Sequence, residues 1–409
     1  MPDGLNSITM SAEQAASTRK ALVAFTTDAN AEAALRKGLS DAVPGELDIR
    51  RVRLRDAIAQ LSNMPTPSSL LVDVSGESDP LGLLAELAQI VDPDVRVLVI
   101  GDQEDRDFYR QVTRELGAAE FLYKPLVPDA VARVFGTAIL RHTPRRSSIG
   151  ATFVSVTGAR GGAGTTTIAA NLAWHLAHNA RRHTVLLDAD LQMGSAALLL
   201  GVASSSGLRV ALEQPSRVDE LFVERAAQPV HGEDRLHILA ATEDLDAPIT
   251  IGPDAVVAVL GALSRRYNII IGDVPFRPTA LNLDMLDQAH QRVQRVIVMQ
   301  PTLGSVREAL RLISLPAGSG QARRPILVLN RAGRPGGLTA AQIHHALAVH
   351  PDIIVPDLPR PVEAAASLGK PAAATVKGLA RAIAQLANEL AGTGGHSAPR
   401  RRRLFGRGR

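Results

Sequence analysis

Residues 158 to 167 have the composition of a loop that binds phosphate groups. Glycines let a backbone turn its N–H groups toward phosphate oxygens, and the start of a following helix adds partial positive charge. The segment follows an apolar run, 151–156, and precedes a helical pattern, which is the context that a P-loop requires. The residues predicted to contact a nucleotide are Gly158, Arg160, Gly161, Gly162, Ala163, Gly164, Thr165, Thr166 and Thr167.

The cation that such loops usually carry is missing. A lysine ordinarily precedes the final Ser/Thr and reaches the outer phosphates, whereas Thr165 stands at that position. Losing one charge-assisted hydrogen bond costs about 1.5–3 kcal/mol, or roughly ten- to a hundredfold in affinity. We therefore expect a triphosphate to bind and to be hydrolysed poorly or not at all. The alternative is that Thr165 is an ordinary first-turn residue without catalytic meaning.

Carboxylates follow two apolar runs downstream of the loop. Asp188 and Asp190 end the run that begins at Thr184, and Asp273 ends the run that begins at Tyr267. Ligands of open α/β sheets sit at the carboxyl ends of strands, so these acids are expected beside the loop. Mg²⁺ prefers oxygen ligands, which makes the acids candidates for a metal shell. Each of them alone could equally be a strand-end cap.

An alternation of strand-like and helix-like segments predicts the elements that position these residues. The fold class is α/β, with two doubly wound parallel-sheet domains at residues 20–143 and 151–392. In the first domain, strands are predicted near 20–26, 47–53, 69–74, 95–100 and 120–124. In the second, they are predicted at 151–157, 183–188, 235–240, 268–273, 294–299, 325–330 and 352–355, and a long helix at 375–391.

The remaining segments are predicted to be a flexible N-terminus at 1–19, a linker at 144–150 and a flexible arginine-rich tail at 393–409. The last ten residues contain six arginines and no acid, although the net charge of the chain is only +4. The tail could rest on an anionic membrane, bind nucleic acid nonspecifically or be solvated. The rest of the chain is close to neutral, so a nucleic-acid partner is not expected.

Composition narrows the class of protein further. There is no cysteine among the 409 residues, which excludes disulfides and thiolate metal sites. The polar N-terminus has no apolar core typical of a secretory signal, and no apolar run is long enough to span a bilayer. These features predict a cytoplasmic protein.

The order of these motifs is similar to that of the deviant Walker A ATPases, the MinD/ParA group. That group carries Lys-Gly-Gly-x-Gly-Lys-Thr-Thr where this chain has Arg160 to Thr167. Asn330, which ends a predicted strand and could read an adenine edge, and the segment Val355–Asp357 also match. Within the group the chain most resembles the CpaE/TadZ pilus-assembly proteins, which have a small residue in place of the lysine and a receiver-like domain first. The resemblance covers roughly residues 20–392.

This resemblance implies ATP and Mg²⁺ as cofactors and a role for each site residue. Arg160 stands where the signature lysine reaches across a homodimer to the partner's nucleotide. Thr166 would coordinate Mg²⁺ through its hydroxyl, and Asp188 and Asp273 would belong to the metal shell. Asp190 would position the attacking water, so Asp190 and Arg160 are the candidate catalytic residues.

Residues 20–143 resemble a response-regulator receiver. Asp73 ends the third predicted strand, where a phosphoacceptor would sit, and Lys124 followed by proline ends the fifth. The expected acidic pair after the first strand is missing, since Phe25–Thr27 stands there, and Gly101 replaces the hydroxyl residue after the fourth. Phosphoryl transfer needs Mg²⁺, and without the acidic pair the ion would have too few oxygen ligands. We therefore expect a pseudo-receiver for protein contacts, in which an Asp73–Lys124 pair is structural, rather than a phosphorylated switch.

The resemblance implies an ATP-binding assembly or localisation factor of a Flp/Tad-type pilus. Its expected partners are a second copy of the chain and the pilus secretion machinery, with peripheral contact at the inner membrane or a cell pole. Two alternatives stay open. One is an active partitioning or positioning ATPase of the ParA/MinD type, and the other is a two-component-type regulator.

Overall fold

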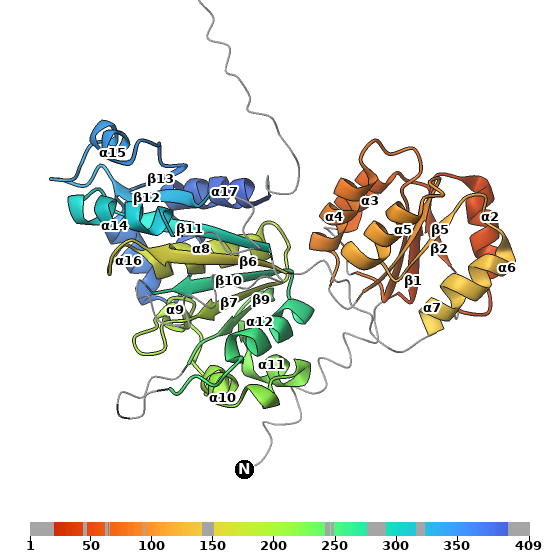
Figure 1. Ribbon diagram of the computed structural model, residues 1–409, viewed down its shortest axis with the longest axis horizontal. Coiled ribbons are helices and arrows are strands. Elements are labelled where there is room, and N and C mark those ends of the chain that lie inside the picture. The colour runs from red at the N-terminus through yellow and green to blue at the C-terminus, as the bar shows by residue number, and fades with distance from the viewer. Residues whose placement is uncertain are drawn as a thin grey trace, which may run out of the picture.

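The computed structural model contains two α/β domains (Figure 1). It describes residues 20–43, 47–61, 64, 66–92, 95–140, 151–241, 246, 249–275, 292–315 and 324–391. The predictions for the N-terminus at 1–19, the linker at 144–150 and the tail at 393–409 concern residues outside these ranges. No helix in the described ranges has the length and apolar character needed to cross a bilayer.

The first domain is a parallel sheet in the order β2-β1-β3-β4-β5, which is the flavodoxin-like order of doubly wound sheets. Its strands are β1 (Leu22–Phe25), β2 (Asp48–Arg50), β3 (Ser69–Asp73), β4 (Arg96–Gly101) and β5 (Glu120–Tyr123). Its helices are α2 (Ala29–Gly38), α3 (Leu54–Leu61), α4 (Pro80–Ile90), α5 (Arg106–Arg110), η1 (Gln111–Glu115), α6 (Pro128–Val131), η2 (Ala132–Gly136) and α7 (Thr137–Leu140). Every strand predicted for this domain is present.

Alternate residues of the first-domain strands face opposite apolar layers. On β1, Val23 and Phe25 belong to the cluster that contains Leu54 of α3, whereas Leu22 belongs to the cluster that contains Leu35 of α2. Successive side chains of a strand point to opposite faces, and a parallel sheet covered on both faces needs apolar residues on each. The near-continuous apolar runs of the sequence therefore produce this three-layer domain.

The second domain has an eight-stranded sheet in the order β13-β12-β11-β6-β10-β7-β9-β8. The strands are β6 (Thr152–Gly158), β7 (Thr184–Asp188), β8 (Gln228–Val230), β9 (Glu233–Leu239), β10 (Ile269–Val274), β11 (Arg292–Met299), β12 (Ile326–Ala332) and β13 (Ile353–Pro356). The α/β fold class is confirmed. One strand that was not predicted, β8, lies at the edge of this sheet and pairs antiparallel with β9. Gly232, with φ of +79°, turns the chain between them.

Helices cover both faces of this sheet (Figure 1). They are α8 (Thr165–His178), α9 (Ala196–Leu199), α10 (Gly207–Glu213), η3 (Pro215–Arg217), α11 (Glu220–Ala226), α12 (Ala255–Arg266), α14 (Leu303–Ile313), α15 (Ala340–Leu347), α16 (Pro359–Ser367), η4 (Ala372–Ala374) and α17 (Lys377–Ala391). The last of them coincides with the long helix predicted at 375–391.

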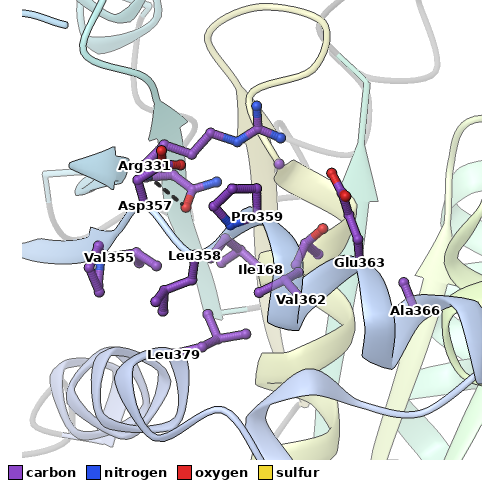
Figure 2. A pocket seen from close by; sticks show the side chains of 14 residues that line it. Ile168, Arg331, Val355, Asp357, Leu358, Pro359, Val362, Glu363, Ala366 and Leu379 are labelled. Carbon is purple, nitrogen blue, oxygen red and sulfur yellow. Dashed lines mark hydrogen bonds between the residues drawn. The ribbon is translucent and has the colours of Figure 1, made fainter. Parts of the chain in front are cut away.

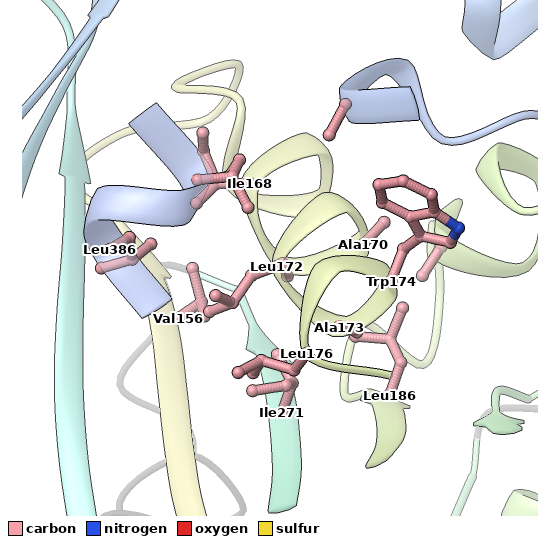
Figure 3. Packing of buried hydrophobic residues seen from close by; sticks show 14 of the residues in the cluster. Val156, Ile168, Ala170, Leu172, Ala173, Trp174, Leu176, Leu186, Ile271 and Leu386 are labelled. Atoms are coloured by element: carbon pink, nitrogen blue, oxygen red, sulfur yellow. The ribbon is translucent and has the colours of Figure 1, made fainter. Parts of the chain in front are cut away.

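Helix α8 is enclosed between the sheet and α17, and this packing fixes the start of the helix (Figure 3). Leu172 and Leu176 pack in one buried cluster with Val156 of β6, Ile271 of β10 and Leu386 of α17. A helix that is apolar on nearly all sides must be buried in this way. The loop between β6 and α8 is consequently anchored at both ends by core contacts.

The two domains meet at the amino ends of the second-domain strands. Asn268, which precedes β10, donates from Nδ2 to the carbonyl of Ala88 in α4 at 3.0 Å. Asp92, just after α4, pairs with His183, which precedes β7. Arg235 of β9 lies 3.8 Å from the same Asp92 oxygen. The first domain therefore contacts the edge of the sheet opposite the carboxyl ends where the loop lies.

Candidate nucleotide-binding site

The glycine-rich loop connects β6 to α8 at the carboxyl edge of the sheet. Gly162 and Gly164 have φ of +76° and +90°, a region that residues with side chains rarely adopt. The amide of Ala159 donates to a β11 carbonyl at 2.8 Å, and the amide of Ala163 closes a turn onto the carbonyl of Arg160 at 3.1 Å. This strand–loop–helix geometry is the one that presents backbone N–H groups to a phosphate.

Thr165 stands at the lysine position and does not replace the positive charge of a lysine. Its hydroxyl lies against Gly158, so closely that a Cβ on that glycine would clash with it. The guanidinium of Arg160, an exposed residue, packs over Gly304 in the first turn of α14. In this conformation the arginine extends along its own chain, toward the neighbouring β11–α14 connection.

The predicted acidic residues meet beside the loop. Asp188 and Asp273 are in register on neighbouring parallel strands, and both are buried. Asp188 accepts from the amides of Asp190 and Ala196, each at 3.1 Å, while the hydroxyl of Thr166 hydrogen-bonds to Asp273. Burial, with the nearby charges of Asp188 and Asp190, raises the pKa of Asp273 to about 7.

The raised pKa of Asp273 indicates that a cation bound here would stabilise the ionised carboxylates. Two buried carboxylates and the Thr166 hydroxyl supply the hard oxygen donors that Mg²⁺ prefers. No three acidic, histidine or cysteine side chains of the described ranges gather into a metal cage. Mg²⁺ is ordinarily held by one or two carboxylates together with the phosphates of a substrate. The residues therefore fit a magnesium ion that arrives with a polyphosphate.

Asp190 lies at the start of the turn that follows β7. Its Oδ1 accepts from the amides of Met193 at 3.1 Å and Gln192 at 3.4 Å. These bonds orient a half-buried carboxylate near the two buried ones. Its assignment as the residue that positions water stays a prediction.

A pocket of about 140 Å³ lies beside the loop, next to the first turn of α8 (Figure 2). Its walls come from α8, the end of β12, the end of β13 and the two residues after it, α16 and α17. The lining residues are Gly164, Thr167, Ile168, Asn330, Arg331, Val355, Pro356, Asp357, Leu358, Pro359, Val362, Glu363, Ala366 and Leu379. Apolar side chains with a few polar groups at the rim suit a flat ring such as a base.

Asn330 borders this pocket and contacts the loop directly. Its Nδ2 donates to the carbonyl of Ala163 at 2.8 Å, and its Oδ1 accepts from the amide of Arg331 at 2.9 Å. Gln300, which follows β11, donates from Nε2 to the carbonyl of Gly162 at 2.5 Å. Gln300 was not predicted from the sequence, because a lone glutamine after a strand has no distinguishing pattern.

In the first domain, the predicted pair between Asp73 and Lys124 is formed at 2.7 Å. The same Asp73 oxygen accepts from the hydroxyl of Thr26 at 2.6 Å, and the other oxygen accepts from the amide of Ser75 at 3.0 Å. Lys124 also lies 3.1 Å from Asp28. Asp28 was missed because it directly follows Phe25–Thr27, where the acidic pair was expected, and has the local pattern of the N-cap of α2.

Sequence comparison gives distant relatives. No protein-family model matches the chain. A putative septum site-determining protein MinD of Guillardia theta is 26% identical over 44% of this chain and 63% of its own length. An uncharacterised ATP-binding protein of Methanocaldococcus jannaschii is 25% identical over 53% of this chain and 78% of its own length. The chain thus spans less than two thirds of the first relative.

Solved structures also match the chain. A pilus assembly protein CpaE from Caulobacter crescentus is 33% identical over 28% of this chain and 96% of its own, with a TM-score of 0.27. A ParA family ATPase from Chlorobium tepidum has a TM-score of 0.53 at 21% identity, over 60% of this chain and 100% of its own. The cell division ATPase MinD of Pyrococcus furiosus has a TM-score of 0.51 at 24% identity, over 59% of this chain and 99% of its own. The second domain, the only one long enough for such coverage, therefore has the fold of the MinD/ParA ATPases.

Proposed function

We propose that this chain is an ATP-binding assembly or localisation factor of a Flp/Tad-type pilus, with weak or absent hydrolysis. One observation carries the nucleotide part. The loop, its helix and the paired acids Asp188 and Asp273 are arranged for Mg²⁺ and a triphosphate, while the lysine position holds Thr165 with its hydroxyl against Gly158. When bound, Mg²⁺ would neutralise charge on the phosphates; the loop amides and Thr166 would orient them.

The pilus part of the proposal rests on domain order and on the replaced lysine. A receiver-like domain followed by a lysine-less MinD/ParA-type domain is the arrangement that resembles the CpaE/TadZ proteins. The bonding of Asp73 supports a pseudo-receiver, because Thr26 and Lys124 both already bond to one of its carboxylate oxygens. In this proposal ATP promotes homodimerisation, and the first domain contacts pilus machinery at the inner membrane or a cell pole. A prepilin gene and a secretion-ATPase gene beside this reading frame would support it.

Titration of the full chain with ATP, with and without Mg²⁺, tests nucleotide binding. We expect saturable binding that Mg²⁺ tightens, and phosphate release at saturating ATP far below that of lysine-bearing relatives. A chain that binds no ATP at millimolar concentration would refute the proposal. Binding with turnover equal to the lysine-bearing enzymes would refute weak hydrolysis.

The second candidate is a working positioning or partitioning ATPase. The fold shared with MinD and ParA-family ATPases favours it, as does the carboxylate of Asp190 near the paired acids. Fast ATP turnover would select this candidate. The third, a two-component regulator, requires that acetyl phosphate label Asp73, and we expect no label.

A further inference from the structure

Two side-chain amides hold consecutive carbonyl groups of the lysine-less loop. Gln300 donates to the carbonyl of Gly162 at 2.5 Å, and Asn330 donates to the carbonyl of Ala163 at 2.8 Å. Gln300 directly follows β11, which pairs with β6, and Asn330 lies near the end of β12, which pairs with β11. The partners are 138 and 167 residues apart in the chain.

We propose that Gln300 and Asn330 are positioning residues that fix the backbone of this phosphate-binding loop. The inference rests on the proposed nucleotide site. The carbonyl and the N–H of one peptide plane point in opposite directions. A carbonyl held outward by a side chain therefore turns the next N–H to the opposite side. Asn330 acts in this way on the amide of Gly164, and Gln300 acts on the turn that Ala163 closes onto Arg160.

The glycines of the loop are the reason that these two side-chain hydrogen bonds are needed to hold its backbone. Gly162 and Gly164 have positive φ values, and glycine loses more conformational freedom on ordering than any other residue. The Cα of Gly164 lies so near Asn330 that a Cβ would clash with Nδ2. Glycine at this position thus permits the close approach, and the carboxamide in turn restrains the glycine.

Other contacts fix the carboxamide of Asn330 and the backbone of Gln300. Asn330 is 8% exposed, and its oxygen accepts from the amide of Arg331, so its amino group must face the loop. The backbone of Gln300 is held by the hydroxyl of Ser305, which accepts from its amide at 2.9 Å. A lysine would have organised the loop by charge; these two residues organise it by fixed, neutral hydrogen bonds.

The experiment measures binding of Mg·ATP and of inorganic tripolyphosphate to the full-length chain. Gln300→Ala and Asn330→Ala should each weaken both ligands by about three- to tenfold. Gln300→Glu and Asn330→Asp keep the side-chain volume but present oxygen to a carbonyl, so they should weaken binding more than the alanine variants. A role in packing alone would not produce this order.

Matched controls are Gln342→Ala, in the capping box of α15, and Asn268→Ala, at the opposite edge of the sheet. Both should leave tripolyphosphate affinity unchanged. Thermal unfolding checks that each variant is folded. Hydrogen exchange gives a second readout, since the Gly164 amide should exchange faster in Asn330→Ala than in the control.

The outcomes separate the two proposals. If the unmodified chain binds neither ligand, the proposed nucleotide site fails and this inference fails with it. If the unmodified chain binds both ligands and the four variants at Gln300 and Asn330 bind them as tightly as it does, the inference alone is overturned. If Asn330→Ala weakens ATP but not tripolyphosphate, Asn330 reads the base instead of positioning the loop.

Discussion

At the scale of single residues, the site is defined by what stands at the lysine position and by where its acids lie. Thr165 rests against Gly158 and offers no charge to a ligand. Asp273 is buried beside Asp188, with Thr166 as a hydroxyl partner. The protein therefore concentrates negative charge where Mg²⁺ would bind and lacks the cation that would stabilise the outer phosphates.

Restoring the lysine tests whether the rest of the site is complete. Thr165→Lys should tighten ATP binding about ten- to a hundredfold, because one charge-assisted hydrogen bond is worth about 1.5–3 kcal/mol. It should also raise phosphate release, where charge stabilisation dominates catalysis. Thr165→Met, which adds length without charge, is the control. Tighter binding without turnover would locate a further defect in the catalytic residues.

The raised pKa of Asp273 predicts a pH dependence of stability in the nucleotide-free protein. Its ordinary value is 3.8 and its folded value is about 7, so the folded state binds the proton more tightly. Stability should fall as pH rises from about 4 through 7 and level off above. Asp273→Asn should flatten this slope and stabilise the protein by about 1–4 kcal/mol at pH 8, measured by urea unfolding. An unchanged slope would contradict the assignment.

At the scale of elements, the buried side chains of α8 fix the position of the loop that precedes it. Leu172 lies in the cluster that joins the sheet to α17, and it is fully buried. The N-cap of the helix is Gly164, whose φ of +90° sets the direction in which the chain leaves the loop. The orientation of the loop amides thus depends on side chains one to three turns away.

Leu172→Ala should therefore destabilise the second domain by about 2–5 kcal/mol, the range for a buried leucine that leaves a cavity. Leu198→Ala in α9 is the matched control, because that leucine is 73% exposed, and it should change stability by less than about 0.5 kcal/mol. Equal effects of the two substitutions on urea unfolding would show that α8 is not packed as described.

At the scale of the whole molecule, the domain junction connects the receiver-like domain to the strands that carry the acids. His183 precedes β7, which ends in Asp188, and Asn268 precedes β10, which ends in Asp273. The junction and the candidate metal shell are thus opposite ends of the same two strands. The carboxylate of Asp92 is the charged group at the centre of the domain junction, and His183 and Arg235 are its partners.

The junction should weaken in acid. Burial favours the neutral form of Asp92, but the hydrogen bond and charge of His183 outweigh it and lower the pKa of Asp92. A lowered pKa contributes stability above pH 4 that is lost as pH falls toward the folded value. Asp92→Asn should remove about 1–3 kcal/mol and speed proteolysis between the domains at neutral pH. Asp107→Asn, at an 82% exposed side chain, should not.

The sequence by itself determined the α/β rhythm, the glycine loop and the acids at strand ends, because each of these is a local pattern of adjacent residues. It also predicted the Asp73–Lys124 pair, because the end of each strand was readable from the chain. It did not predict the antiparallel β8, whose three residues are too short to form a pattern.

The tertiary structure alone decided which distant residues act on the loop. Gln300 and Asn330 reach it because β11 pairs with β6 and β12 pairs with β11, and strand order depends on the packing of the whole sheet, not on any one segment. Asp28 joined Lys124 for the same reason, across a sheet whose order the chain does not spell out locally. Contacts between remote segments arise only when the core has assembled, and here they govern the candidate site.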